Sequence, residues 1–118
     1  MNDRELIIGT WADDYEINYK IDDHLWKMGS EITFHVIEWN RNKNFIIVEN
    51  DSNNAYNAGQ YSRIDYIILD NMKPYEWAFC LTAYDKDTAI DARNTPAADG
   101  ENPKSGCNGF PFSRMKRY

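Results

Sequence analysis

Hydrophobic and polar residues alternate along much of this chain with a period of two. The segment YEINYKI, residues 15–21, places tyrosine or isoleucine at every odd position and a polar residue at every even one. Successive side chains of a β-strand point to opposite faces, so this alternation predicts a strand with one buried and one wet face. The segment EITFHVIEW, residues 31–39, repeats the pattern at Ile32, Phe34 and Val36.

Turn-forming residues separate such segments at short intervals, and about eight strands are predicted. They cover LIIGTW (6–11), YEINYKI (15–21), HLWKM (24–28), EITFHVIEW (31–39), FIIVEN (45–50), RIDYIILD (63–70), YEWAFCLTAY (75–84) and GFPFSRMKR (109–117). One helix is predicted over KDTAIDAR (86–93), with Asp85 as its N-cap and Pro96 after its end.

No predicted helix is long enough to connect parallel strands, so the strands are expected to form an antiparallel meander. Closing a meander of this size into a barrel removes its exposed strand edges. We therefore predict a single all-β domain over residues 1–118, an eight-stranded antiparallel meander barrel with one short helix before the last strand. A barrel of eight strands has room inside for its own side chains or for one small ligand.

Aromatic residues make up 14% of the 118 residues and are spread over alternating strands. Rings that point inward either fill such a barrel or line a pocket in it, and both alternatives are open. The candidate ligand-binding residues are Phe34, Trp39, Tyr66, Trp77, Phe79 and Phe112. The long polar loop over residues 51–62 and the loop over residues 95–108 are expected at one end of the barrel, where Tyr56, Asn57 and Tyr61 are candidate contacts for a partner.

The net charge and the lack of known motifs argue against several classes of partner and site. The net charge of -6 argues against a nucleic-acid partner, which needs a basic face. No apolar run approaches the roughly 20 residues that cross a bilayer. Cys80 beside His24 or His35 lacks a third residue to orient a base, and residues 51–62 lack the glycine and glutamate of a calcium loop. We predict a monomer that is not an enzyme, with no catalytic residue, metal ligand or cofactor.

The two cysteines indicate in which cellular compartment the protein works. Cys80 lies in the most strand-like segment, and Cys107 lies in the glycine-flanked loop KSGCNGF (104–110). One such pair in a small domain is typical of a disulfide in an exported protein, and the alternative is two unrelated thiols in a cytosolic protein. The first residues, MNDRE, are polar and contain no secretory signal, so export implies that Met1 stands in place of a removed signal.

Gly9-Thr10-Trp11 on the first predicted strand is similar to the Gly-x-Trp of the lipocalin and calycin barrels. In those families the tryptophan closes one end of the barrel and packs on a basic residue of the last strand. The resemblance implies that role for Trp11, with Arg114 or Arg117 as its partner. This chain is shorter than a full lipocalin and lacks the long C-terminal helix of that family.

A second resemblance covers more of the chain. Residues 9–15, 62–70 and 79–113 are similar to a group of small exported bacterial proteins and lipoproteins. Their Tyr-Cys-x-Thr-Ala-Tyr-Asp and Gly-Cys-x-Gly-Phe elements correspond here to Cys80–Asp85 and Gly106–Phe110. The resemblance implies a periplasmic, outer-membrane-anchored or secreted protein with a Cys80–Cys107 bridge, and it supplies no activity.

Two functions are consistent with these features. The first is a binding protein of the bacterial envelope that carries a small apolar ligand in a lipocalin-like barrel. The alternative is a protein-interaction module, such as a hydrolase inhibitor or a host-contact protein, that binds through its loops.

Overall fold

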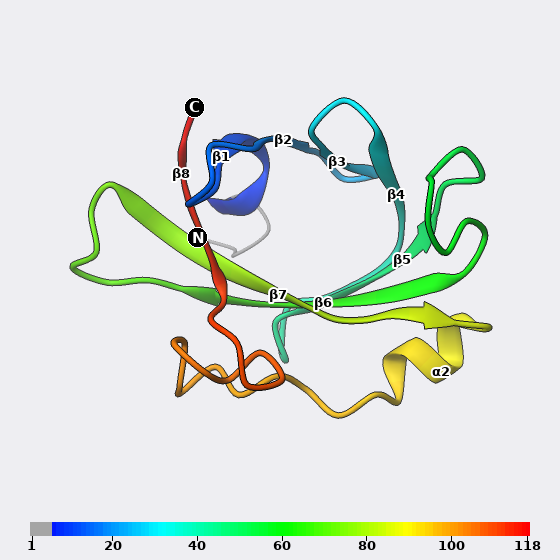
Figure 1. Cartoon of the computed structure of the whole chain (residues 1–118). Coiled ribbons are helices and arrows are strands. Elements are labelled where there is room, and N and C mark those ends of the chain that lie inside the picture. The colour runs from blue at the N-terminus through cyan, green and yellow to red at the C-terminus, as the bar shows by residue number, and fades with distance from the viewer. Residues whose placement is uncertain (1–5) are drawn as a thin grey trace.

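The structure is a computed structural model and describes residues 6–118. Eight antiparallel strands follow one another around a closed barrel in sequence order (Figure 1). They are β1 (Gly9–Ala12), β2 (Asn18–Ile21), β3 (Leu25–Met28), β4 (Ile32–Asn40), β5 (Phe45–Asn50), β6 (Tyr61–Ile68), β7 (Tyr75–Lys86) and β8 (Ser113–Arg117), and helix α2 (Ala89–Arg93) lies between β7 and β8. The predicted fold, an all-β eight-stranded antiparallel meander barrel with one short helix before the last strand, is confirmed.

The barrel closes where its first and last strands meet. β1 and β8 are joined by two residue pairs, Trp11 with Arg117 and Ala12 with Lys116. On its other side, β8 pairs with β7, but only with the first part of that strand, up to Phe79. The second part of β7 therefore extends beyond β8.

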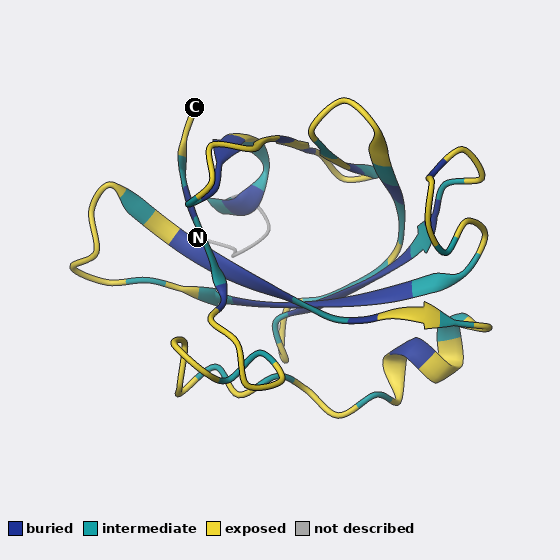
Figure 2. Cartoon of the chain, in the orientation of Figure 1, coloured by how far each residue is buried: buried dark blue, intermediate teal, exposed yellow. Residues whose placement is uncertain are grey.

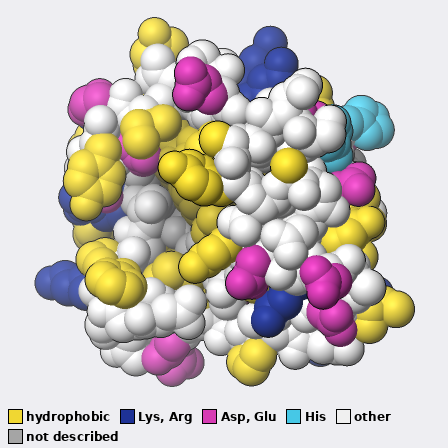
Figure 3. All heavy atoms as spheres, turned by 45° about the vertical axis from the view of Figure 1, so that its right-hand side comes forward, with side chains coloured by type: hydrophobic (Ala, Val, Ile, Leu, Met, Phe, Trp, Pro, Cys, Tyr) yellow, Lys and Arg dark blue, Asp and Glu magenta, His cyan; other side chains and the backbone are white. Residues whose placement is uncertain are grey.

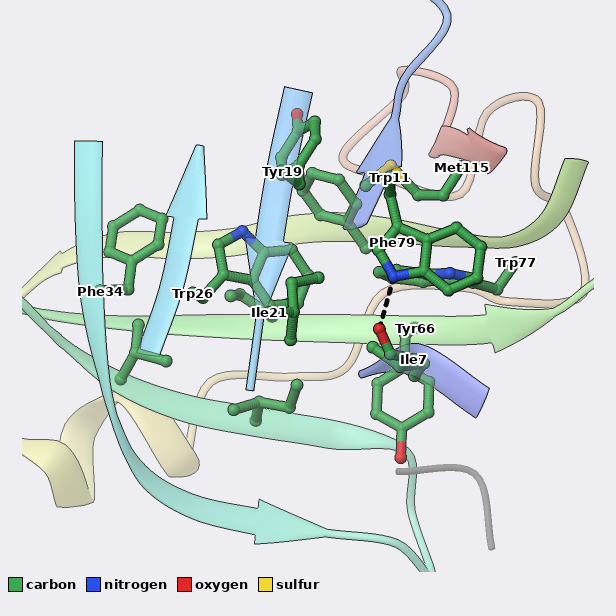
Figure 4. Close-up of a cluster of buried hydrophobic side chains, with 13 residues drawn as sticks. Ile7, Trp11, Tyr19, Ile21, Trp26, Phe34, Tyr66, Trp77, Phe79 and Met115 are labelled. Carbon is green, nitrogen blue, oxygen red and sulfur yellow. Dashed lines mark hydrogen bonds between the residues drawn. The ribbon is translucent and has the colours of Figure 1, made fainter. Parts of the chain in front are cut away.

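Every strand contributes at least one side chain to the buried core inside the barrel. Trp11, Trp26 and Trp77 have no exposed surface, and neighbouring rings meet edge to face, as Trp26 and Trp77 do with centroids 5.9 Å apart. Figure 4 shows this packing around the indole rings. The core consists of Ile7, Trp11, Tyr19, Ile21, Trp26, Phe34, Ile46, Val48, Ile64, Tyr66, Trp77, Phe79 and Met115.

A β-bulge decides which residues of β4 join this core. Phe34 and Val36 point inward, as the alternation predicts. The register then shifts between Val36 and Glu38, so one extra residue is inserted. Because of the inserted residue, the alternation shifts by one position, and the other set of the following residues points into the barrel. Trp39 consequently packs against the core, and Glu38 does not.

The outer face of β5 to β7 is covered by α2 and by the segment over residues 94–112, which we call the covering segment. Ala92 of α2 packs on Phe45 and Ile47, which point outward from β5. Phe112 packs on Ala78 and Cys80, which point outward from β7. Figure 2 shows the buried middle of β6 and β7 between the barrel interior above and this cover below. The sheet is thus buried on both faces here.

A buried ion pair fastens the cover to β6. Arg63 and Asp65 are each 5% exposed, and the Arg63 Nη2 atom lies 3.1 Å from Asp65 Oδ1. Arg63 Nη1 donates hydrogen bonds to the carbonyl oxygens of Arg93 and Thr95, at 2.7 and 2.9 Å. Asp65 accepts a hydrogen bond from the backbone N–H of Ala98 at 3.2 Å. Both charges are therefore compensated by the segment that buries them.

Cys80 and Cys107 form a disulfide with an S–S distance of 2.04 Å, which confirms the predicted pairing. The bond joins the outward face of β7 to the covering segment across 27 positions of sequence. Cross-linking a loop of this length restricts the unfolded chain and is expected to stabilise the fold by about 3 kcal/mol.

Reduction should therefore lower the free energy of unfolding by about 3 kcal/mol, because the unfolded chain regains its loop entropy. Urea unfolding with and without reductant measures this loss. The Cys80→Ala/Cys107→Ala variant is the control, since it should be insensitive to reductant. Two thiols that are freely alkylated in the unreduced, denatured protein would contradict the pairing.

Several predicted boundaries are wrong, each for a local reason. Leu6 and Ile7 are helical, and β1 begins only at Gly9. The next strand begins at Asn18, because residues 13–17 form a turn closed by a hydrogen bond from the Asp13 N–H to the Ile17 carbonyl. Helix α2 is shorter than predicted.

The end of the chain differs from its prediction in the same way. The Thr88 hydroxyl, and not Asp85, caps α2 by accepting a hydrogen bond from the Asp91 N–H. β8 begins only at Ser113, so Phe110 and Phe112 lie in a loop and not on one face of a strand. The segment over residues 95–108 runs along the outside of the barrel and does not join the loop over residues 51–62 at one end (Figure 1).

Candidate binding surface

The structure divides the candidate ligand-binding residues between the interior and the exterior of the barrel. Phe34, Tyr66, Trp77 and Phe79 lie in the buried core. Trp39 is half-buried beside them. They are packed mainly against one another and the other core rings, whereas Phe112 lies outside the barrel in the cluster that covers β7.

Hydrogen bonding inside the barrel is incomplete at two rings. Trp39 Nε1 donates to the Tyr66 hydroxyl at 3.1 Å. The buried Nε1 atoms of Trp26 and Trp77 have no hydrogen-bond partner among residues 6–118. Both indoles meet aromatic neighbours edge to face, an arrangement in which the positive edge of one ring faces the negative face of another.

Trp11 closes the barrel next to its seam. Its Nε1 donates to the Ile7 carbonyl at 2.6 Å, and the Arg117 guanidinium lies 4.0 Å from the centre of its ring. Gly9 makes room for that guanidinium, because a Cβ at this position would lie 2.6 Å from Arg117 Nη1. The stacking of a last-strand arginine on Trp11 is the contact that the Gly-x-Trp resemblance implies, with Arg117 and not Arg114 in that position.

A hollow of about 960 Å³ lies on the outside of the barrel, and we call it the outer groove. It runs between the β1–β2 turn, the β6–β7 turn and the end of the covering segment; Figure 1 shows the last two on the same side of the molecule. Its walls are mostly apolar and aromatic. The lining residues are Asp14, Tyr15, Leu69, Met72, Tyr75, Ala78, Pro103, Lys104, Phe110, Pro111, Phe112, Ser113 and Arg114.

Phe110 stands on one wall of the outer groove and is 70% exposed. The backbone of its loop is tied down by two hydrogen bonds, from Phe110 N–H to the Cys107 carbonyl at 2.8 Å and from Cys107 N–H to the Phe110 carbonyl at 3.0 Å. Gly109 adopts a φ of 91°, a left-handed conformation that favours glycine. Together with the disulfide, these bonds hold an exposed phenyl ring on a rigid loop.

Tyr15 stands on another wall and is 82% exposed. The Asp13 carboxylate, which is buried, accepts hydrogen bonds from the backbone N–H groups of Tyr15 and Ile17, at 2.8 and 3.0 Å. It also accepts one from the Tyr19 hydroxyl at 2.8 Å. Burial and this carboxylate raise the pKa of Tyr19, so the hydroxyl keeps its proton. The turn that presents Tyr15 is thus anchored to the barrel core.

The polar part of the groove is a network of three side chains. Arg114 donates to Asp14 from Nε at 3.0 Å and lies within 2.8 Å of it through Nη2. The same guanidinium stacks 4.1 Å from the centre of the Tyr75 ring. Burial alone would raise the pKa of Asp14, but the hydrogen bonds from Arg114 and Tyr75 outweigh it and lower that pKa below its usual value of 3.8.

The lowered pKa of Asp14 predicts a pH-dependent contribution to stability. A depressed carboxylate pKa stabilises the fold above the unfolded pKa of 3.8, and this stabilisation is lost as the pH falls through the lowered folded-state pKa. The difference in unfolding free energy between wild type and Asp14→Asn should therefore shrink as the solution is acidified from neutral pH. Urea unfolding over a pH series measures it. A constant difference would contradict a charge-dependent role for Asp14.

The loop over residues 51–62, which was predicted to contact a partner, is fixed to β4 by hydrogen bonds. Asp51 accepts a hydrogen bond from His35 Nε2 at 2.7 Å, and Asn54 bonds both backbone groups of Thr33. Tyr56 is 83% exposed at the tip of this loop.

The other two candidate contact residues, Asn57 and Tyr61, have contacts within the protein. The Asn57 carbonyl accepts from the Asn50 side chain at 2.9 Å, and Tyr61 packs against the cluster under α2. Of the three predicted contact residues, Tyr56 has the most exposed side chain.

Comparison with known proteins finds no matching family model, no matching curated protein and no matching solved structure. Among residues 6–118, no helix is both long and apolar enough to cross a lipid bilayer. In the same range, no three His, Cys, Asp or Glu side chains are grouped so that they could hold a metal ion. Figure 3 shows one face of the molecule on which Lys and Arg side chains form no continuous patch.

Sequence reasoning missed the outer groove because it placed Tyr15 on the buried face of a strand and Phe110 within the last strand. Local signals for both exist. Asp13 precedes Tyr15, and aspartate commonly closes a turn through its side chain. Gly109 and Pro111 flank Phe110, and both residue types interrupt strands.

Proposed function

We propose that this chain is a non-enzymatic binding protein of an oxidising, exported compartment that takes a protein partner on the outside of its barrel. The observation that carries the proposal is the contrast between the two sides of the barrel wall. Inside, the rings pack on one another. Outside, exposed aromatic side chains stand on rigid turns around a hollow of about 960 Å³.

Exposed aromatic residues of this kind are suited to binding. The backbones of Tyr15 and Phe110 lose little conformational freedom when a partner covers them, because hydrogen bonds already fix these backbones. Large aromatic side chains are also enriched among the residues that dominate binding energy at protein interfaces. The Cys80–Cys107 disulfide supports the exported location, since such bonds persist in oxidising compartments.

A carrier of a small ligand is the second candidate function. The observation that favours it is the pair of buried indole Nε1 donors without acceptors, on Trp26 and Trp77. A small ligand with a polar atom inside the barrel would satisfy one of them. It would have to displace rings that now fill the interior.

One pair of measurements separates the two functions. Random peptides displayed on phage are selected on the immobilised protein, and the apolar dye N-phenyl-1-naphthylamine is titrated against it in solution. We expect specific peptides to be enriched and the dye to leave the emission of the buried tryptophans unchanged. Saturable dye binding with quenching of that emission, together with no enriched peptide, would contradict the interaction module and favour the carrier.

A further inference from the structure

We infer that the outer groove binds an extended segment of a partner protein in which large apolar side chains lie next to an acidic residue. This inference rests on the proposed function and adds to it the place of binding and the chemistry of the partner. It follows from three properties of the groove: its aromatic walls, the pairing of its polar groups, and its charge.

The walls suit a chain of apolar side chains. Tyr15 and Phe110 project from two separate turns into the lining of one groove, and Pro103 and Pro111 lie beside them. Grooves lined by aromatic residues commonly bind extended or proline-containing peptides. Because the disulfide-bonded loop and the Asp13-closed turn fix the backbone that carries the two rings, the groove exists before the partner arrives.

The pairing of polar groups disfavours a ligand rich in hydroxyl groups. Asp14 accepts hydrogen bonds from the Arg114 side chain and from its backbone N–H. Arg114 also stacks on Tyr75. The hydrogen-bonding capacity of Asp14 and Arg114 is largely used within the protein, so a sugar would find few partners between them. An apolar side chain needs none of them.

The charge of the lining favours an acidic residue next to the apolar side chains of the partner segment. The lining holds two cations, Lys104 and Arg114, and one carboxylate, Asp14. Asp14 and Arg114 neutralise each other, whereas Lys104 is exposed and forms no ion pair with any of residues 6–118. The lining therefore carries a net charge of +1 on a chain with a net charge of -6, and the unpaired Lys104 ammonium is complementary to an acidic residue in the partner.

The test uses the phage-selected peptides themselves, labelled and measured by fluorescence anisotropy. We expect the enriched sequences to combine aromatic or aliphatic residues with Asp or Glu. The Tyr15→Ser/Phe110→Ser variant should bind them at least about tenfold more weakly, a loss of about 1.4 kcal/mol. Lys104→Glu should weaken the acidic peptides and favour versions in which Lys replaces the acidic residue.

Two controls make the result specific. Tyr56→Ser removes an equally exposed tyrosine outside the groove and should leave the affinity unchanged. The altered side chains are exposed, so the fold should survive, and thermal unfolding monitored by circular dichroism checks this.

Three outcomes would overturn the inference. Peptides that bind but are insensitive to Tyr15→Ser/Phe110→Ser and sensitive to Tyr56→Ser would place the site on the loop over residues 51–62 and leave the proposed function intact. Complete displacement of the peptides by decanoate at equal affinity would identify a site for small amphiphiles. Failure to enrich any peptide would contradict both this inference and the proposed function.

Discussion

Replacing Trp11 by alanine is expected to lower the free energy of unfolding by about 3–5 kcal/mol, as for other large buried aromatic residues. The side chain has no exposed surface and packs edge to face on Trp77, with ring centroids 5.5 Å apart. The variant leaves a cavity, removes the hydrogen bond to the Ile7 carbonyl and exposes Arg117 to solvent on one side. Urea unfolding followed by circular dichroism measures the loss.

Two further variants separate these contributions. Trp11→Phe keeps an aromatic ring under Arg117 but loses the Nε1 hydrogen bond, so its cost should be smaller. Tyr15→Ala removes an exposed ring of similar size and should change stability by less than about 0.5 kcal/mol. A loss below about 1 kcal/mol for Trp11→Ala would show that this end of the barrel does not depend on the indole.

Breaking the buried pair of Arg63 and Asp65 should be equally severe. Asp65→Ala leaves the Arg63 guanidinium buried without its counter-charge, and this is expected to cost about 3–5 kcal/mol. The same variant also removes the acceptor for the Ala98 N–H. The covering segment should therefore loosen before the barrel does, which hydrogen exchange at residues 94–98 would detect.

A variant that replaces both Arg63 and Asp65 shows how much of the loss comes from the unpaired charge. Arg63→Met/Asp65→Leu removes the unpaired charge, so it should recover part of the loss. The recovery should be incomplete, because the carbonyl oxygens of Arg93 and Thr95 lose the donor that they share. As a matched control, Glu38→Gln breaks the exposed pair with Arg93 and should cost less than about 1 kcal/mol. A single variant no worse than this control would contradict the role of the buried pair.

The fold was predictable because its signals are local. Alternation with a period of two marks β2 and most of β4, and short polar turns separate the strands, so antiparallel neighbours follow directly from the order of the sequence. The bulge after Val36 was not predictable, because it depends on the register with β5. The cap of α2 was misplaced because Asp85 and Thr88 are both good capping residues, and only the contacts of β7 extend that strand past Asp85.

The candidate site was less accessible to sequence reasoning, since a surface groove is made by segments distant in the chain. Phe34, Tyr66, Trp77 and Phe79, proposed as ligand-binding residues, lie in the core, but periodicity does not tell whether inward rings leave space between them. Phe112 shows the opposite difficulty. Its neighbours on β7 are the outward-facing Ala78 and Cys80, so a buried phenylalanine near a barrel strand need not lie inside the barrel.

The burial of Cys80 bears on the order of events during folding. This residue is 1% exposed, beneath Phe112 and the loop that carries Cys107. An oxidant or isomerase needs access to the thiol, and thiol–disulfide exchange requires an attacking sulfur to reach it. β1 to β7 can pair through connections that are short in sequence, whereas the covering segment returns to β7 only after 27 positions. We therefore expect the bond to form while that segment is still open, before the final closure of the outer layer.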